Sequence, residues 1–214
     1  MKSFLLIGLG KFGHHLCVDL LEAGCEVMIV DTVEDRIEDL LPIVTSAKIG
    51  DCSNPEVIAS LGIKNFDACF VCIAEDFQNS LEITSLLKEM GARKVISRAD
   101  RDVQAKFLLR NGADEVVYPD KDIAEKIAKK YSKDNIFDYI EIDDDYGIYE
   151  IAPFADIVGK TVIESNFRRK YSANIIGYKK NDRIILMIEP SYVFKEEEHL
   201  LVMANRKHIE KLLD

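Results

Sequence analysis

The chain has 214 residues, of which 48% are hydrophobic and 31% are charged, so it is long enough for one or two domains with packed cores. Its formal net charge of −10 argues against broad nucleic-acid binding, which needs a basic face. No apolar run is long enough to span a bilayer and no signal peptide is visible, so we expect a cytoplasmic protein.

The first predicted strand, Ser3–Ile7, runs into a glycine-rich turn that opens a helix over residues 11–23. The turn has the pattern Gly-x-Gly-x-x-Gly. Gly8 permits a tight turn, Gly10 lets a pyrophosphate approach the backbone, and Gly13 lets the helix pack closely on the strand. The helix N-terminus offers N–H groups and a partial positive charge to phosphates. The turn therefore predicts a nucleotide site, and the alternative is a tight turn that binds nothing.

The second predicted strand, Glu26–Asp31, ends in an acid. Asp31 lies at the spacing at which a carboxylate accepts hydrogen bonds from the hydroxyls of a ribose. Its charge would oppose a 2′-phosphate, so a ligand of the NADP type is disfavoured.

Strands and helices then alternate regularly. Strands are predicted at residues 44–49, 68–73, 94–98 and 115–118, and helices at 33–41, 76–90 and 100–111. A further helix starts at Asn54, which we expect to cap it ahead of Pro55. This alternation is typical of the α/β class, with a Rossmann-like doubly wound parallel sheet whose switch point lies beside the first and fourth strands.

A helix predicted from residue 120 to about 133 precedes a change of pattern. Short strands are expected at residues 139–142, 147–151, 175–178, 183–187 and 200–204, with short helices within 158–167 and at 206–213. These elements predict a small α+β C-terminal lobe, so we divide the chain into residues 1–134 and 135–214. The run Glu196-Glu197-Glu198 is expected to be a solvated turn.

Several charged side chains follow the predicted parallel strands and so should meet at one edge of the sheet. Asp51 is expected to accept a hydrogen bond from an adenine amino group, or else to cap the next helix. Arg98 is expected to contact phosphate or to pair with an acid of the pocket, and Lys11 either reaches phosphates or is a surface lysine. The predicted nucleotide-binding residues are Gly8, Gly10, Lys11, Phe12, Gly13, Asp31, Asp51, Cys52, Ala74, Glu75 and Arg98.

The chain offers little sign of catalysis. Cys69 and Cys72 lie three apart on a predicted strand and so face opposite sides, which favours core packing over a metal or redox pair. The four histidines are expected to be exposed or packed, without a partner for metal or base chemistry; they are His14, His15, His199 and His208. The second lobe is small for a substrate domain, and no P-loop is present. We therefore expect binding without turnover, and a NAD-dependent oxidoreductase with a reduced substrate lobe is the alternative.

Longer segments carry a resemblance to a known family. The runs GLGKFG, SRADRD and NGADEVVYPDK resemble the N-terminal RCK (KTN) domain, and GKTVIESNFRRKYSANIIGYKK resembles its C-terminal partner domain. The whole chain is similar to the cytosolic regulatory subunits of Trk/Ktr potassium uptake systems, the Ktr type most of all. A regulator with a different, non-channel partner is a further alternative.

The resemblance implies a subunit without enzymatic activity. Family members form dimers that assemble into an octameric ring at the inner face of the membrane, under a potassium transporter. They bind ATP or ADP in Ktr-type rings and NAD or NADH in several Trk-type rings, and the bound nucleotide changes ring shape and gates the pore.

The resemblance also assigns roles to single residues. It places the three glycines at the phosphates, Asp31 at the ribose and Asp51 at the adenine. Lys11 occupies a position that is often an arginine contacting the γ-phosphate of the neighbouring subunit's nucleotide, and lysine keeps the charge without the bidentate fork. Asp120 matches an acid, usually glutamate, that can bind a divalent cation such as Mg²⁺ or Ca²⁺ near the phosphates.

Some family members bind cyclic di-AMP at the dimer interface of the second lobe. The positions at which such contacts are expected here are Ile163, Arg168, Asn174 and Pro190. The ordinary alternative for these residues is core, surface or turn.

Overall fold

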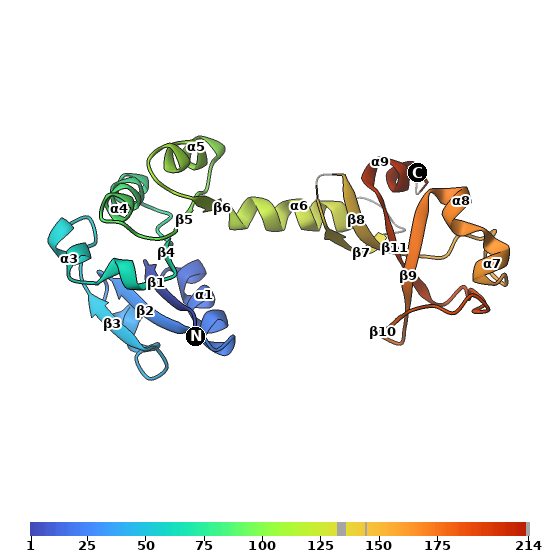
Figure 1. Ribbon diagram of the computed structural model, residues 1–214, viewed down its shortest axis with the longest axis horizontal. Helices are drawn as coiled ribbons and strands as arrows, with labels where there is room; N and C mark the ends of the chain where they lie inside the picture. Colours follow the sequence, from blue (N-terminus) through green and yellow to red (C-terminus); the bar gives the residue numbers. More distant parts are fainter. Residues whose placement is uncertain (132–135, 144, 213–214) are drawn as a thin grey trace. The chain divides into compact units, whose positions relative to one another are not determined.

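The computed structural model describes residues 1–131, 136–143 and 145–212, which form two compact units, Met1–Asp122 and Ile123–Asp214 (Figure 1). Each unit has its own sheet and its own hydrophobic core. The predicted division between residues 134 and 135 lies outside the described residues.

The first unit contains a six-stranded parallel sheet of order β3-β2-β1-β4-β5-β6. Its strands are β1 (Ser3–Ile7), β2 (Glu26–Asp31), β3 (Ser46–Ile49), β4 (Ala68–Val71), β5 (Val95–Arg98) and β6 (Glu115–Val117). The chain starts in the middle, proceeds to one edge, and returns to the middle at β4. Ile7 therefore pairs with Val30 on one side and with Val71 on the other, and the switch point lies between β1 and β4. This confirms the predicted doubly wound sheet.

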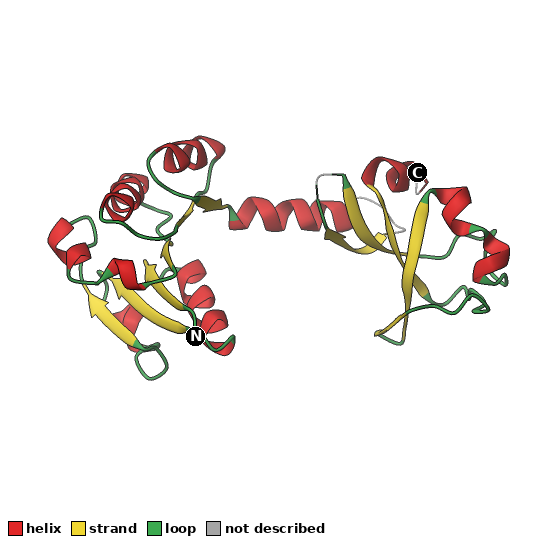
Figure 2. Ribbon diagram, viewed as in Figure 1, coloured by secondary structure: helices red, strands yellow, loops and turns green. Residues whose placement is uncertain are grey.

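Helices cover both faces of this sheet (Figure 2). They are α1 (Lys11–Glu22), α2 (Asp35–Glu38), α3 (Pro55–Ala59), α4 (Phe77–Glu89) and α5 (Asp102–Arg110), with a short 3₁₀ turn at Ile63–Asn65. A further helix, α6 (Pro119–Tyr131), starts in the first unit after β6, and its residues from Ile123 onward belong to the second unit. The Asn54 side chain caps α3 as predicted, accepting a hydrogen bond of 2.9 Å from the Glu56 N–H.

The helix predicted at residues 33–41 is wrong in length, because only α2 is helical there. Ile37 and Leu40 are buried in this segment, whereas Val33 and Leu41 are exposed. Two apolar anchors hold about one turn against the sheet, and the chain continues through turns to Pro42.

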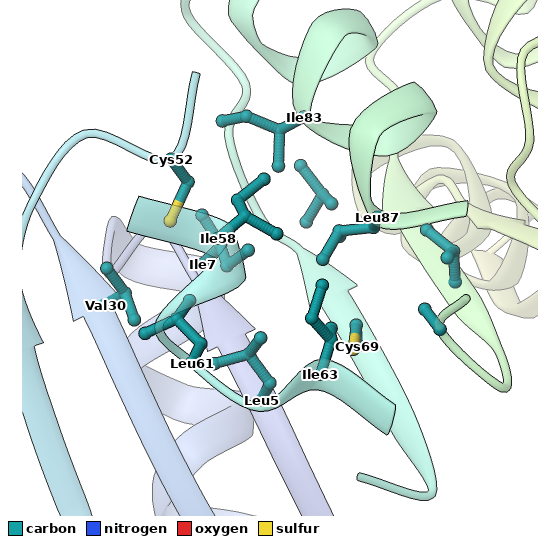
Figure 3. Close-up of a cluster of buried hydrophobic side chains, with 13 residues drawn as sticks. Leu5, Ile7, Val30, Cys52, Ile58, Leu61, Ile63, Cys69, Ile83 and Leu87 are labelled. Carbon is teal, nitrogen blue, oxygen red and sulfur yellow. The ribbon is translucent and has the colours of Figure 1, made fainter. Parts of the chain in front are cut away.

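Two apolar clusters fill the faces of the sheet. On one face, side chains of β1, β2 and β4 pack against Ile58 of α3 and against Ile83 and Leu87 of α4 (Figure 3). On the other face, Leu6 and Ile29 belong to a cluster with α1 and α2. Both members of the Cys-x-x-Cys pair, Cys69 and Cys72, are buried as predicted, and burial raises the pKa of each thiol to about 12.

The second unit is built on a five-stranded antiparallel sheet of order β10-β9-β11-β8-β7. Its strands are β7 (Ile136–Glu141), β8 (Tyr146–Ile151), β9 (Ala173–Lys180), β10 (Arg183–Leu186) and β11 (His199–Asn205), and its helices are α7 (Val162–Ser165), α8 (Phe167–Tyr171) and α9 (Arg206–Leu212). Asn181 and Asp182 form the predicted turn between β9 and β10 with φ values of 48° and 60°. The α+β lobe is confirmed, although α8 was not predicted as a separate helix.

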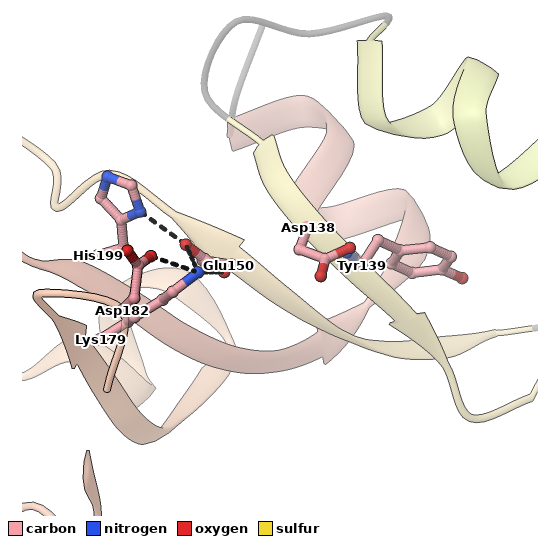
Figure 4. A network of polar contacts seen from close by, with 6 residues as sticks. All are labelled: Asp138, Tyr139, Glu150, Lys179, Asp182 and His199. Atoms are coloured by element: carbon pink, nitrogen blue, oxygen red, sulfur yellow. Dashed lines mark hydrogen bonds and ion pairs between the residues drawn. The ribbon is translucent and has the colours of Figure 1, made fainter. Parts of the chain in front are cut away.

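A polar network joins β8, β9 and β11 of this second sheet (Figure 4). The buried carboxylate of Glu150 bonds the Lys179 ammonium at 3.2 Å and the His199 ring at 2.7 Å. The His199 ring also stacks on Phe137, with ring centroids 3.7 Å apart. His199 is thus a packed histidine with a carboxylate partner that the sequence pattern did not reveal.

The predicted solvated turn at residues 196–198 is wrong for Glu198, whose side chain is 1% exposed. Its carboxylate accepts hydrogen bonds from the Tyr192 hydroxyl and lies 3.1 Å from the Lys180 ammonium. Burial alone would raise the pKa of Glu198, but the bonds from Tyr192 and Lys180 outweigh it and hold the pKa below its usual range.

Glu198 should therefore make the stability of the second unit depend on pH. Because its pKa is lower in the folded state, its contribution is present above the unfolded value of about 4.3 and is lost as the pH falls through the folded value. Glu198→Gln should lower the free energy of unfolding at neutral pH by roughly 1–3 kcal/mol. It should also reduce the loss of stability that occurs as the pH is lowered. Urea unfolding followed by tyrosine fluorescence measures both. The neighbouring Glu197 is exposed, so Glu197→Gln should change neither quantity, and equal effects of the two variants would contradict the assignment.

Candidate functional site

A cavity of about 870 Å³ lies at the carboxyl edge of the parallel sheet. Its lining comes from the turn after β1, from the segments that follow β2, β3, β4 and β5, and from the start of α6. Open α/β sheets bind ligands at this edge, beside the switch point. The volume is within the range of about 300–1,000 Å³ that is usual for small-molecule sites.

The glycine turn forms one wall of the cavity. Gly8 has φ of +91°, and a Cβ there would lie 2.9 Å from the Ile73 side chain. Gly13 does not line the cavity; a Cβ on it would lie 2.1 Å from the Gly8 carbonyl oxygen, so it is the close packing position that was predicted. A Cβ on Gly10 would meet no described atom within 4 Å. Gly10 therefore faces space that a ligand can use, and no side chain caps α1 there.

Asp31 has a structural role that was not predicted. Its side chain is 3% exposed, and its two oxygens accept hydrogen bonds from the N–H groups of Leu9, at 2.6 Å, and Val33, at 2.9 Å. The Arg36 guanidinium lies 3.6 Å from the same carboxylate. Asp31 lines the cavity and at the same time fixes the glycine turn. Its contact with a ribose remains a prediction.

The segments after β3 and β4 bring further predicted residues to the cavity, namely Asp51, Cys52, Ala74 and Glu75. Asp51 accepts a hydrogen bond of 2.9 Å from the Ser53 N–H and leaves the cap of α3 to Asn54. Cys52 is buried, and this burial, reinforced by the neighbouring Asp51 carboxylate, raises the pKa of its thiol to about 12.

Arg98 ends β5 at the opposite side of the glycine turn from β2. Its guanidinium is held by two acids, with Nε and Nη2 each 3.1 Å from Asp100 Oδ1 and Nη2 3.5 Å from Asp120 Oδ2. It also lies 5.7 Å from the centre of the Phe12 ring. Of the two roles expected for Arg98, the structure displays pairing with acids of the pocket.

Asp120, in the first turn of α6, lines the cavity and its carboxylate contacts Arg98. No group of three potential metal-ligating side chains occurs among the described residues. Divalent cation binding by Asp120 therefore remains a prediction.

Several lining residues were not predicted: His15, Thr32, Arg36, Asn79 and Asp100. Arg36 follows Asp31 by five residues, within a helix whose length was overestimated, and Asp100 follows Arg98 by two. The turn composition after β2 and β5 was the only signal that could have indicated Thr32, Arg36 and Asp100.

A smaller cavity of about 340 Å³ lies in the second unit. Ile163, Arg168 and Asn174 line it, and these are three of the four positions named for cyclic di-AMP. Pro190 does not line it, but its carbonyl oxygen accepts a hydrogen bond of 3.3 Å from the Ile163 N–H.

Comparison with known families matches both units. The TrkA-N domain matches residues 4–119 and the TrkA-C domain matches residues 148–214. The chain belongs to the TrkA-N/TrkA-C family. It is 35% identical to the Ktr system potassium uptake protein C of Bacillus subtilis, over 95% of this chain and 92% of the relative. It is 33% identical to the Ktr system potassium uptake protein A of the same organism, over 98% and 95%. These matches confirm the resemblance to the Ktr-type regulatory subunits of potassium uptake systems.

Solved structures share the fold. A GsuK channel bound to NAD superposes with a TM-score of 0.69 at 17% identity, covering 100% of this chain and 39% of that one. A GsuK structure bound to ADP gives a TM-score of 0.54 at 14% identity, over 63% and 36%. No helix in the described part of the chain is long and apolar enough to cross a membrane.

The second and third glycines of the turn, Gly10 and Gly13, should respond differently to alanine. Gly13→Ala forces a Cβ against the Gly8 carbonyl and should cost at least about 3 kcal/mol of stability. Gly10→Ala meets open space and should cost less than about 1 kcal/mol while weakening nucleotide binding. Urea unfolding followed by circular dichroism, together with a nucleotide titration, separates the two effects. Equal loss of stability in both variants would show that the crowding at Gly13 is relieved by movement of the turn.

Proposed function

We propose that this protein is a nucleotide-sensing regulatory subunit that gates a membrane potassium transporter or channel. The observation that carries the proposal is the open face of Gly10 at the uncapped N-terminus of α1, within a cavity of nucleotide size. That arrangement suits phosphate binding. The near full-length identity to two proteins named for Ktr potassium uptake supplies the physiological setting.

The proposed ligand is ATP or ADP, with NAD or NADH as the alternative. In this proposal the phosphates lie at the N-terminus of α1 and the ribose near Asp31, with the adenine on the side of Asp51 and Cys52. Lys11 is exposed at the cavity wall and has no ion-pair partner among the described residues, so its ammonium is available to phosphates. The NAD-bound and ADP-bound GsuK structures, which share this fold, support both ligand classes.

The proposed mechanism is a population shift without turnover. Chains would pair into dimers and close into an octameric ring at the inner face of the cell membrane, peripherally attached through the transporter. A ligand biases such a ring only by binding its two conformations with different affinity. The two thiols that line the cavity, Cys52 and Cys72, have pKa values raised by burial to about 12, so neither is a nucleophilic thiolate near neutral pH.

The direct test identifies the nucleotide that survives purification, by mass spectrometry of the denatured protein, and measures the mass of the native protein in solution. We expect ATP or ADP and a particle near eight times 24.3 kDa. NAD instead would favour the alternative ligand. A stable monomer that binds no adenine nucleotide would refute the proposal, and oxidation of NADH with a keto acid would favour the oxidoreductase. Co-purification with a potassium transporter distinguishes the gating role from a different partner.

A second candidate function concerns the smaller cavity. We infer that it binds cyclic di-AMP, because Ile163, Arg168 and Asn174 come from separate elements and meet around one hollow. An arginine suits a phosphodiester, and apolar side chains beside it suit a base.

Arg168 and its neighbour Arg169 form a matched pair for testing this site. Arg168 lines the cavity and Arg169 does not, although both are in α8. Arg168→Ala should weaken binding of cyclic di-AMP at least about tenfold through loss of a charge-assisted contact, whereas Arg169→Ala should leave it nearly unchanged. Calorimetric titration measures both. Equal losses of affinity in the two variants would point to general charge attraction. Absence of cyclic di-AMP binding by the parent protein would refute this second candidate function.

A further inference from the structure

Carboxylates outnumber cations around the larger cavity, although its proposed ligand is an anion. Three cationic side chains line it, Lys11, Arg36 and Arg98, against six acids. The acids are Asp31, Asp51, Glu75, Asp76, Asp100 and Asp120. Arg36 lies 3.6 Å from Asp31, and Arg98 is bonded to Asp100 and Asp120. Two of the three positive charges are therefore already neutralised within the protein.

The sheet order fixes which end of the cavity each charge occupies. Asp31 ends β2 on one side of the glycine turn, and Arg98 ends β5 on the other side, beyond β4. A nucleotide with its ribose near Asp31 and its first phosphates at the turn after β1 extends any further phosphate toward β5. The guanidinium of Arg98, beside the Phe12 ring of the first turn of α1, stands at that end.

The hydrogen bonds of Arg98 leave neither edge of its guanidinium intact for a phosphate. Asp100 Oδ1 takes both Nε and Nη2 at 3.1 Å, which occupies the edge formed by these two nitrogens. Asp120 lies 3.5 Å from Nη2, so the edge formed by Nη1 and Nη2 is engaged as well. Bidentate recognition of a phosphate needs one free edge. A phosphate that takes two hydrogen bonds from either edge of Arg98 must therefore displace a carboxylate, and both carboxylates repel it.

We propose that Asp100 is a specificity-determining residue that lowers the affinity of the cavity for nucleotides with more phosphates, by withholding Arg98 from the distal phosphate. This inference rests on the proposed nucleotide-binding function. Arg98 would then not act as a ready phosphate ligand, although an arginine at this edge of the sheet would ordinarily be expected to do so.

Asp100 is better placed for this role than Asp120. The side chain of Asp100 is 34% exposed and that of Asp120 is 81% exposed, so water screens the second acid more strongly. The backbone of Asp100 is also fixed, because its N–H donates to Gln104 Oε1 at 3.0 Å and its carbonyl accepts a hydrogen bond from the Tyr118 hydroxyl. Neither contact uses the carboxylate, so Asp100→Asn removes the charge and preserves the local fold.

The test is calorimetric titration of the full-length protein with ATP, ADP and AMP in a metal-free buffer. We expect Asp100→Asn to tighten ATP binding about tenfold and ADP binding less, with AMP nearly unchanged, as expected for a charge removed near a partly buried arginine. The charge-matched control is Asp102→Asn, because the carboxylate of Asp102 bonds Lys121 at 2.8 Å and does not line the cavity. Its affinities should equal those of the parent protein.

The possible results separate the inference from the function on which it rests. An unchanged ratio of ADP to ATP affinity in Asp100→Asn, or an equal shift in Asp102→Asn, would overturn the inference alone. Weaker ATP binding by Asp100→Asn would also overturn it, because Asp100 would then orient Arg98 toward the ligand. If the parent protein binds NAD but no mononucleotide, the sensing function stands and the inference falls. If the parent binds no adenine nucleotide or dinucleotide, both fall.

Discussion

The close approach of the Gly8 carbonyl to Gly13 is the constraint on which the first unit depends. With only 2.1 Å between that oxygen and a would-be Cβ, no other residue lets α1 begin so near the end of β1. The bond of 2.6 Å from the Leu9 N–H to Asp31 then ties the turn to the end of β2. These two contacts hold the N-terminus of α1 at the sheet edge, so the backbone of the turn is ordered by the protein itself. In the proposed function, a nucleotide therefore need not supply that ordering free energy.

The order of the strands in the sheet places the functional groups of the cavity in a row along the sheet edge. From β3 to β5, the cavity passes Asp51, Asp31, the glycine turn and Arg98. The apolar clusters on both faces keep the strands in register, which makes the spacing of these groups a property of the core. A substitution in the core can therefore alter the site without touching it, by shifting one strand end relative to the next.

Features that arise from local pattern were predictable from the sequence, and features that arise from distant packing were not. The strand at Ser3–Ile7, the glycine turn and the Asn54 cap each depend on a few neighbouring residues. The burial of Glu198 depends on Lys180 of β9 and on Tyr192, which no pattern within an acidic run can reveal. The predicted length of α2 was wrong for the same reason, because the spacing of apolar residues in the sequence does not indicate which of them are buried in the core. At the site, a residue's position at the strand end was predictable, while its pairing was not: Arg98 was expected at the edge, but Asp100 was not identified as its partner.

The ion pairs of Arg98 decide which cationic side chain of the cavity is available to a phosphate. An arginine ordinarily binds phosphate better than a lysine because of its planar fork, so Arg98 would be expected to dominate over Lys11. Here the fork of Arg98 is engaged by Asp100 and Asp120, while Lys11 is exposed beside Gly10 without an ion-pair partner in the described chain. In the proposed function, the first phosphates thus contact the N-terminus of α1 and the ammonium of Lys11, which is carried on a flexible side chain. Each further phosphate lies nearer to the carboxylates of Asp100 and Asp120. A site built this way discriminates by repulsion at its far end rather than by attraction at its near end, and the specificity of a binding site depends on such unfavourable contacts as much as on favourable ones.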